Sequence, residues 1–204
     1  MSKIYIVVSS TPTLIGKSIR AITNSQYNHV SFSFDSNLKD LISFGRYYYS
    51  IPFYGGYIHE SIERYTLNGK TSIIKLFELE IEEEKFKAIQ NLIYQIENSK
   101  EKYTYNYHNA LLMPFNMKKE VPESYTCLNF IQNVLELCGF KTNEISSINK
   151  LIDFLKKFQI YEGPITKFDL SENKYFLKDF STREKISLTY KQNLLFVKQM
   201  FHAK

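Results

Sequence analysis

The chain has 204 residues, of which 44% are hydrophobic and 23% are charged, and both values are ordinary for a globular fold. The 26 basic and 21 acidic residues leave a formal net charge of +5, and lysines are mixed with glutamates, as in residues 82–85. Nucleic-acid binding usually needs basic residues clustered on one face. We therefore predict no nucleic-acid partner, and a membrane surface is compatible with this mild basicity but is not indicated by it.

The two cysteines, Cys127 and Cys138, are predicted to stay reduced. On one helix their α-carbons would lie roughly 16 Å apart, whereas a disulfide needs about 7 Å or less. The apolar stretch at the N-terminus is too short for the core of a signal peptide. No window reaches the length of a membrane-spanning helix, so we expect a cytoplasmic protein.

The first elements follow from hydrophobic periodicity. Residues 3–9 are rich in β-branched residues and predict a strand, and residues 12–23 have apolar residues at helical intervals and predict a helix. Residues 29–34 alternate perfectly and place His29 on the polar face, which predicts a half-buried strand with that face toward solvent. Residues 40–45 are predicted to be the hairpin partner of that strand.

Residues 46–70 combine Pro52 and three glycines with many aromatic residues, so they are predicted to form a long structured loop of the kind that often binds ligands. The remaining predictions are a strand at 71–80, a helix at 82–98, mostly irregular chain at 103–124, a helix at 127–138 ended by Gly139, a helix at 143–157, a strand at 158–162 and a closing helix that includes 194–201. We predict one domain at residues 1–165 and a C-terminal extension at 166–204 packed on it.

Cys127 has the position that a nucleophilic thiol needs. It follows a segment that contains Pro122 and opens a strongly helical one, so it falls in the first helical turn. Unpaired N–H groups and the helix dipole favour an anion there. A small buried cysteine is the ordinary alternative, and we assign that role to Cys138, near the helix end where the dipole opposes a thiolate. Spacing alone does not decide whether His29 or His108 would be the base of Cys127.

Two short motifs favour His29. The segment Asn28-His29-Val30-Ser31-Phe32, followed by a hairpin, and the segment Tyr125-Thr126-Cys127-Leu128-Asn129-Phe130, which opens a helix, resemble the circularly permuted branch of the NlpC-type, papain-like cysteine hydrolases. Lecithin:retinol acyltransferase-like proteins belong to the same group. Phe44-Gly45-Arg46 and the segment 55–60 also resemble members of this group, and the resemblance covers about residues 1–165.

The resemblance implies an α+β, permuted papain-like fold in which an antiparallel sheet packs against helices. It implies Cys127 as nucleophile and His29 as base. The third, orienting residue falls near Ser43, with Glu60 as the rival candidate and an ion pair to Arg46 or Arg64 as the alternative role of Glu60.

The implied activity is cleavage of an amide or ester bond through a thioester, without a cofactor or metal. The expected substrate is a small peptide, a lipid-linked amide or a lipid ester. The alternatives are a lipid acyltransferase and a non-catalytic lipid- or peptide-binding module of the same fold. The aromatic residues Tyr48, Phe53 and Tyr57 are predicted to bind the substrate, and a loop that only seals the sheet edge is the alternative.

Overall fold

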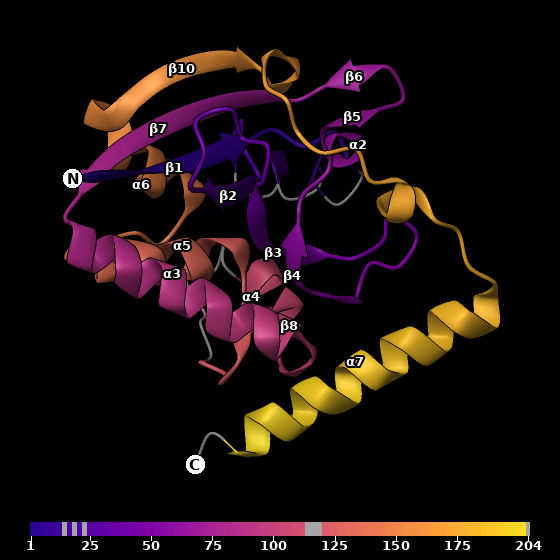
Figure 1. The fold of residues 1–204 in the computed structure, drawn as a ribbon. Coiled ribbons are helices and arrows are strands. Elements are labelled where there is room, and N and C mark those ends of the chain that lie inside the picture. Colours follow the sequence, from indigo (N-terminus) through magenta and orange to yellow (C-terminus); the bar gives the residue numbers. More distant parts are fainter. Residues whose placement is uncertain (14–15, 18–19, 22–23, 113–119, 203–204) are drawn as a thin grey trace.

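Six strands form one antiparallel sheet in the part of the chain that the computed structural model describes, namely residues 1–13, 16–17, 20–21, 24–112 and 120–202 (Figure 1). The strand order is β10-β7-β1-β2-β3-β4. Their bounds are β1 Ser2–Ser9, β2 His29–Ser33, β3 Ile42–Arg46, β4 Gly55–His59, β7 Ile73–Ile81 and β10 Gln159–Pro164. Together with its helices, this sheet confirms the predicted α+β class.

Helices cover one face of the sheet. The two-residue strands are β5 Thr66–Leu67, β6 Lys70–Thr71, β8 Thr104–Tyr105 and β9 Ser124–Tyr125, and the α-helices are α2 Ile62–Tyr65, α3 Glu83–Asn98, α4 Tyr107–Leu112, α5 Cys127–Leu137, α6 Ile148–Leu155 and α7 Thr182–His202. Val30, Phe32 and Phe44 share one buried core with residues of α3, α5 and α6. No described helix has the length and apolar character needed to cross a bilayer.

The strongly periodic segments are close to the sequence predictions. The strands predicted at 3–9 and 71–80 are β1 and β7, and the helix predicted at 82–98 is α3. Gly139 adopts φ +88° just beyond α5, which is the left-handed conformation that glycine provides at helix ends. The helix predicted at 12–23 includes 14–15, 18–19 and 22–23, which lie outside the described residues.

Two sequence predictions are wrong. The segment 46–70 is not one long loop, because it contains β4 and α2, and β4 pairs with β3 along its whole length. The strand β2 is not half-buried, because all five of its residues are buried. Tyr65 and Glu60 lie against its polar side, where they contact Ser31, so that face never meets solvent.

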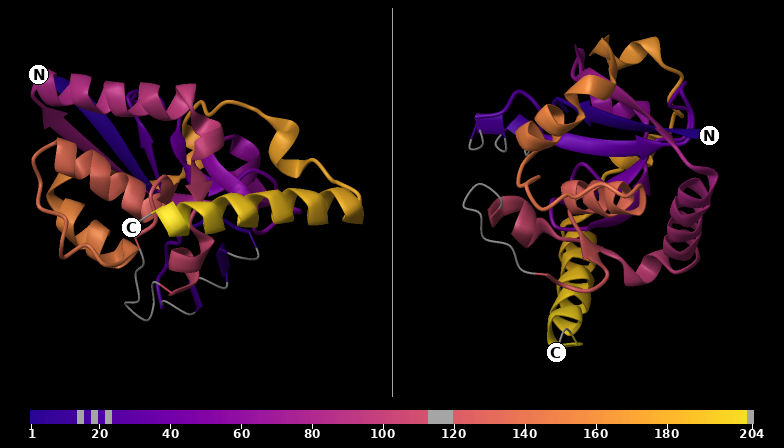
Figure 2. Two further views of the ribbon diagram at one scale, coloured as in Figure 1. Left: turned by 90° about the horizontal axis from the view of Figure 1, so that it is seen from below. Right: turned by 90° about the vertical axis from the view of Figure 1, so that its left-hand side faces the viewer.

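The C-terminal extension wraps around the edge of the domain that carries α2. Ser171 O accepts a hydrogen bond from Ile62 N at 3.1 Å, and the Phe176 ring lies 4.2 Å from the Arg64 guanidinium carbon. Further along, Gln192 Nε2 donates to Gly55 O at 2.8 Å. The long helix α7 then runs along the periphery, beyond α4 and β8 (Figures 1 and 2).

Candidate active site

Cys127 is the first residue of α5. Thr126 is the N-cap, and its hydroxyl accepts a hydrogen bond from Asn129 N at 3.0 Å. A capped start fixes where the helix begins, so the Cys127 thiol lies at the end of the helix where the dipole favours an anion. Cys127 is 5% exposed and shares the core with the sheet residues that α5 covers.

His29 is held at the beginning of β2 and is 8% exposed. Its Nε2 lies 2.5 Å from Glu60 Oε1 and 3.3 Å from Ser43 Oγ. Ser43 Oγ in turn donates to Glu60 Oε1 at 2.5 Å. The carboxylate is therefore the primary partner of the imidazole, and Ser43 supports the carboxylate as well as lying near the ring.

The pairing of β3 with β4 brings these groups together. Ser43 is paired with Ile58, and Ile42 is paired with His59, in the register of the two strands. Glu60 follows β4 directly, and its backbone N–H donates to Leu41 O at 2.6 Å. Thirty-one residues of sequence separate His29 from Glu60, and the hairpin closes that distance.

Arg64 neutralises the far side of the same carboxylate. Its Nε lies 2.5 Å from Glu60 Oε2, and both side chains are almost completely buried. Arg64 also donates to Arg46 O at 2.5 Å. Glu60 thus forms an ion pair with Arg64 and also contacts His29 through its other carboxylate oxygen.

These contacts shift the ionisation of both partners. Burial disfavours the charged form of Glu60, but the positive charges of Arg64 and His29 outweigh it and lower the pKa of Glu60 well below its ordinary value. Burial also opposes a charged His29, yet the negative charge of Glu60 and the neighbouring Cys127 side chain raise the pKa of His29 above its ordinary value. The site therefore favours a protonated His29 beside an ionised Glu60.

The two nitrogens of the imidazole ring are distinct. Nε2 is engaged by Glu60, so Nδ1 is the nitrogen that remains for a proton exchange with Cys127, whose side chain lies close enough to raise the pKa of the ring. A β-carbon at Gly45 would lie at an ordinary contact distance of 3.7 Å from His29 Cε1 and would be crowded only by Ile58 Cδ1, at 3.1 Å. A thiol, an imidazole and an orienting carboxylate in this order are able to perform nucleophilic acyl transfer.

The other candidate groups lie elsewhere. The His108 ring stacks on Phe196 with centroids 5.0 Å apart. His59 is exposed and bridges Asp40 and Glu97 at 2.6 and 2.8 Å. Neither Cys127 nor Cys138 forms a disulfide, and burial raises the pKa of the Cys138 thiol to about 11. Among the described residues, no group of three or more His, Cys, Asp or Glu side chains is arranged to hold a metal ion.

The predicted substrate residues divide between two places. Tyr48 and Tyr57 line one cavity of about 500 Å³, which also reaches Arg64 and so borders the Glu60 ion pair. Phe53 lies apart, with its ring 5.1 Å from that of Tyr107. The cavity is walled by aromatic side chains of the β3–β4 hairpin and by Tyr175 and Phe176 of the C-terminal extension.

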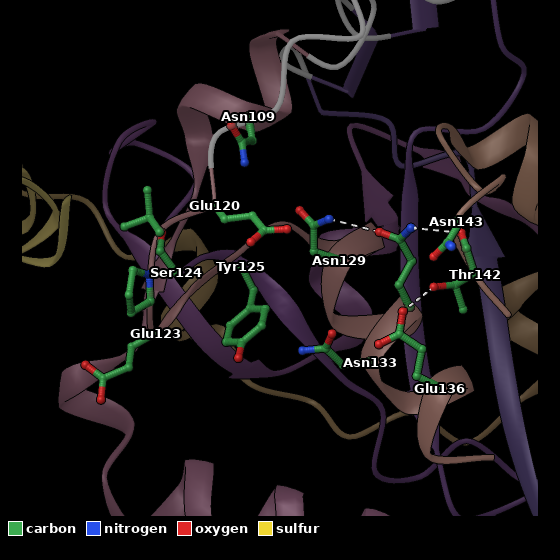
Figure 3. A pocket seen from close by; sticks show the side chains of 13 residues that line it. Asn109, Glu120, Glu123, Ser124, Tyr125, Asn129, Asn133, Glu136, Thr142 and Asn143 are labelled. Atoms are coloured by element: carbon green, nitrogen blue, oxygen red, sulfur yellow. Dashed lines mark hydrogen bonds between the residues drawn. The ribbon is translucent and has the colours of Figure 1, made fainter. Parts of the chain in front are cut away.

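A second cavity lies on the outer side of α5 (Figure 3). It has about 630 Å³ and is lined mostly by carboxamides and carboxylates, among them Asn129, Gln132 and Glu136. These residues face away from Cys127 on the helix, and they are already bonded to one another or to the loop after the helix. Asn129 Nδ2 donates to Gln132 Oε1 at 2.9 Å, and Thr142 Oγ1 donates to Glu136. This cavity is therefore separate from the Cys127–His29–Glu60 cluster.

Sequence reasoning did not anticipate the polar residues behind the carboxylate. Ser31 Oγ lies 3.4 Å from Glu60 Oε1 and 3.2 Å from Tyr65 Oη. The alternation of β2 already placed Ser31 on the same face as His29, and that was the available signal. Comparisons with models of protein families, with curated proteins and with solved structures found no match for this chain.

Proposed function

We propose that this protein is a cysteine hydrolase with a circularly permuted papain-like arrangement, in which Cys127, His29 and Glu60 are the nucleophile, base and orienting acid. The observation that supports it most is the buried contact of 2.5 Å between His29 Nε2 and Glu60 Oε1, next to a thiol at a helix start. The histidine strand β2 precedes the cysteine helix α5 in the chain, and α5 packs against β2 and β3. That order is the one implied by the permuted family.

In the proposed reaction, His29 takes the thiol proton and the thiolate attacks a carbonyl carbon. The imidazolium then protonates the leaving amine or alcohol, which leaves an acyl group on the sulfur as a thioester. His29 next removes a proton from water, the hydroxide attacks the thioester, and the carboxylic acid is released with the thiol restored. The backbone N–H of Cys127 would stabilise the oxyanion, because the first N–H groups of a helix have no acceptor within it.

The proposed substrates are a small peptide, a lipid-linked amide or a lipid ester. The aromatic cavity beside Arg64 is lined by neither Cys127 nor His29, so we propose that it holds an apolar or ring-shaped part of the substrate away from the bond that is cleaved. The same cavity is compatible with the second candidate, a lipid acyltransferase, in which an acceptor alcohol or amine replaces water in the last step. A screen that follows both the released acid and the transferred acyl group separates these two reactions.

The decisive test labels the protein with an alkyne-bearing thiol electrophile and then screens mixed amide and ester substrates. Cys127→Ala should abolish labelling and turnover, whereas Cys138→Ala is the matched control and should retain both. His29→Ala should greatly reduce both activities while a thermal melt shows that the protein remains folded. Turnover that survives in Cys127→Ala would contradict the proposal, as would labelling of wild-type protein that is equally fast at the two cysteines.

A further inference from the structure

The helix α7 presents its apolar residues outward. Ile186, Tyr190, Leu194, Val197 and Phe201 are each between 40% and 70% exposed. At about 100° per residue these five positions fall within an arc of roughly 80°, so they form one stripe along a helix of about 30 Å. We call these five residues the α7 stripe.

The opposite side of α7 is the one that contacts the domain, and it is largely polar. Gln192 and Gln199 are each 6% exposed and Phe196 is 3% exposed. Gln199 Nε2 donates to Lys102 O at 2.6 Å, and Thr104 Oγ1 donates to Gln199 Oε1 at 2.8 Å. Hydrogen bonds therefore hold α7 on the domain in an orientation that leaves the α7 stripe uncovered. The helix itself lies at the periphery of the molecule (Figure 2). A contiguous exposed apolar surface of this kind indicates a site of association.

The positive charge of the chain is concentrated in the same C-terminal part of the sequence. Residues 1–173 contain 19 basic and 19 acidic residues and carry no formal net charge, whereas residues 174–204 contain seven basic and two acidic residues and carry the entire +5. Both acidic residues of that segment are engaged. Asp179 pairs with Lys185 at 2.7 Å, and Glu184 accepts from Ser181 Oγ at 2.6 Å. The surface around the α7 stripe is therefore suited to an anionic partner.

We propose that α7 docks on the surface of a bilayer that contains anionic lipids, with the α7 stripe inserted between the headgroups and the basic residues at the phosphate level. An interfacial helix combines an apolar stripe, interfacial aromatics such as Tyr190 and Phe201, and lysine or arginine beside them. Nucleic acid would use the charge but would leave the aliphatic stripe exposed. A second copy would cover the stripe but would bring the same excess of positive charge against itself. The inference does not depend on the proposed hydrolase activity.

The test is flotation of the full chain with vesicles of phosphatidylcholine alone and of phosphatidylcholine mixed with phosphatidylserine. The wild-type protein should float with the mixed vesicles, and added salt should weaken this binding because it screens the lysines. Arg183→Gln combined with Lys191→Gln should weaken partitioning roughly 25-fold, since each basic residue near an anionic surface contributes about fivefold. Lys39→Gln combined with Lys87→Gln, which changes two exposed lysines outside the C-terminal extension, is the matched control and should bind as the wild type does.

The apolar part is tested separately. Leu194→Gln combined with Val197→Gln should reduce flotation by roughly tenfold or more, while Tyr94→Gln, which changes an exposed ring on α3, should not. Thermal melts confirm that each variant is folded. The proposal is overturned if wild-type protein fails to bind the mixed vesicles, or if the stripe variant binds them as well as wild type. It is also overturned if sedimentation velocity shows a dimer that the stripe variant dissociates, because a second copy would then be the occupant.

Discussion

Replacing Glu60 by glutamine keeps the size of the side chain but removes the charge that Arg64 and His29 share. In the native protein each carboxylate oxygen has a cationic partner at 2.5 Å, Oε1 with His29 Nε2 and Oε2 with Arg64 Nε. The glutamine amide would turn an N–H toward one of these donors. The guanidinium of Arg64 would then be buried without a counter-charge.

The size of the effect follows from burial. Removing one partner of a buried ion pair typically costs about 3–5 kcal/mol, because the remaining charge stays uncompensated. For a chain of about this length, each kcal/mol lowers the melting temperature by about 2–4 °C, so Glu60→Gln should melt roughly 6–20 °C lower. The matched control is Asp40→Asn, which alters the exposed contact of 2.6 Å with His59. An exposed pair contributes at most about 1 kcal/mol, so the control should melt close to wild type.

The difference between Glu60→Gln and wild type should also depend on pH. The lowered pKa of Glu60 stabilises the fold above the ordinary glutamate value of 4.5, and this contribution is lost as the pH falls through the folded pKa. The raised pKa of His29 stabilises the fold below the ordinary histidine value of 6.5, and this contribution is lost as the pH rises through the folded pKa. In chemical denaturation, the free energy of unfolding of Glu60→Gln should therefore fall furthest below that of wild type between pH 4.5 and pH 6.5. A loss for Glu60→Gln no larger than that for Asp40→Asn would refute the buried ion network.

Three further results are expected. Iodoacetamide at neutral pH should modify Cys127 and leave Cys138 intact in the folded protein, because burial raises the pKa of the Cys138 thiol to about 11. Mass spectrometry of the digested protein measures the modification of each cysteine, and equal modification of the two would contradict the prediction. Glu60→Gln should move the alkaline limb of the His29 titration to lower pH, because the negative charge that raises its pKa is gone; an unchanged histidine titration by NMR would contradict it. Tyr48→Ala should lower the free energy of unfolding by only about 0.5–1.5 kcal/mol, because the Tyr48 ring is half-buried and its contacts are mainly aromatic pairs with Tyr54 and its neighbours. A loss of roughly 3–5 kcal/mol, as for a fully buried ring, would mean that Tyr48 is a packing residue and not part of the cavity wall.

Hydrophobic periodicity alone determined the elements whose side chains alternate or repeat. The polar alternation of His29 and Ser31 in β2 and the change to a helical pattern after Thr126 placed a histidine on a strand and a cysteine at a helix start. The same logic located α3 and the beginning of α5. These predictions depend on neighbours along the chain, so one sequence was enough to make them.

The tertiary structure decided which groups meet. The segment Gly55–His59 has no alternating pattern, and it is a strand because its backbone pairs with β3, an interaction that side-chain periodicity does not report. That pairing delivers Glu60 to His29, and Glu60 together with Tyr65 of α2 covers the polar face of β2. Burial is what makes Glu60 rather than Ser43 the dominant partner, because a charge enclosed with His29 and Arg64 interacts far more strongly than a hydroxyl does. Local sequence placed the proposed nucleophile Cys127 at a helix start and His29 on a strand, and the packing of segments distant in the chain brought Glu60 to His29.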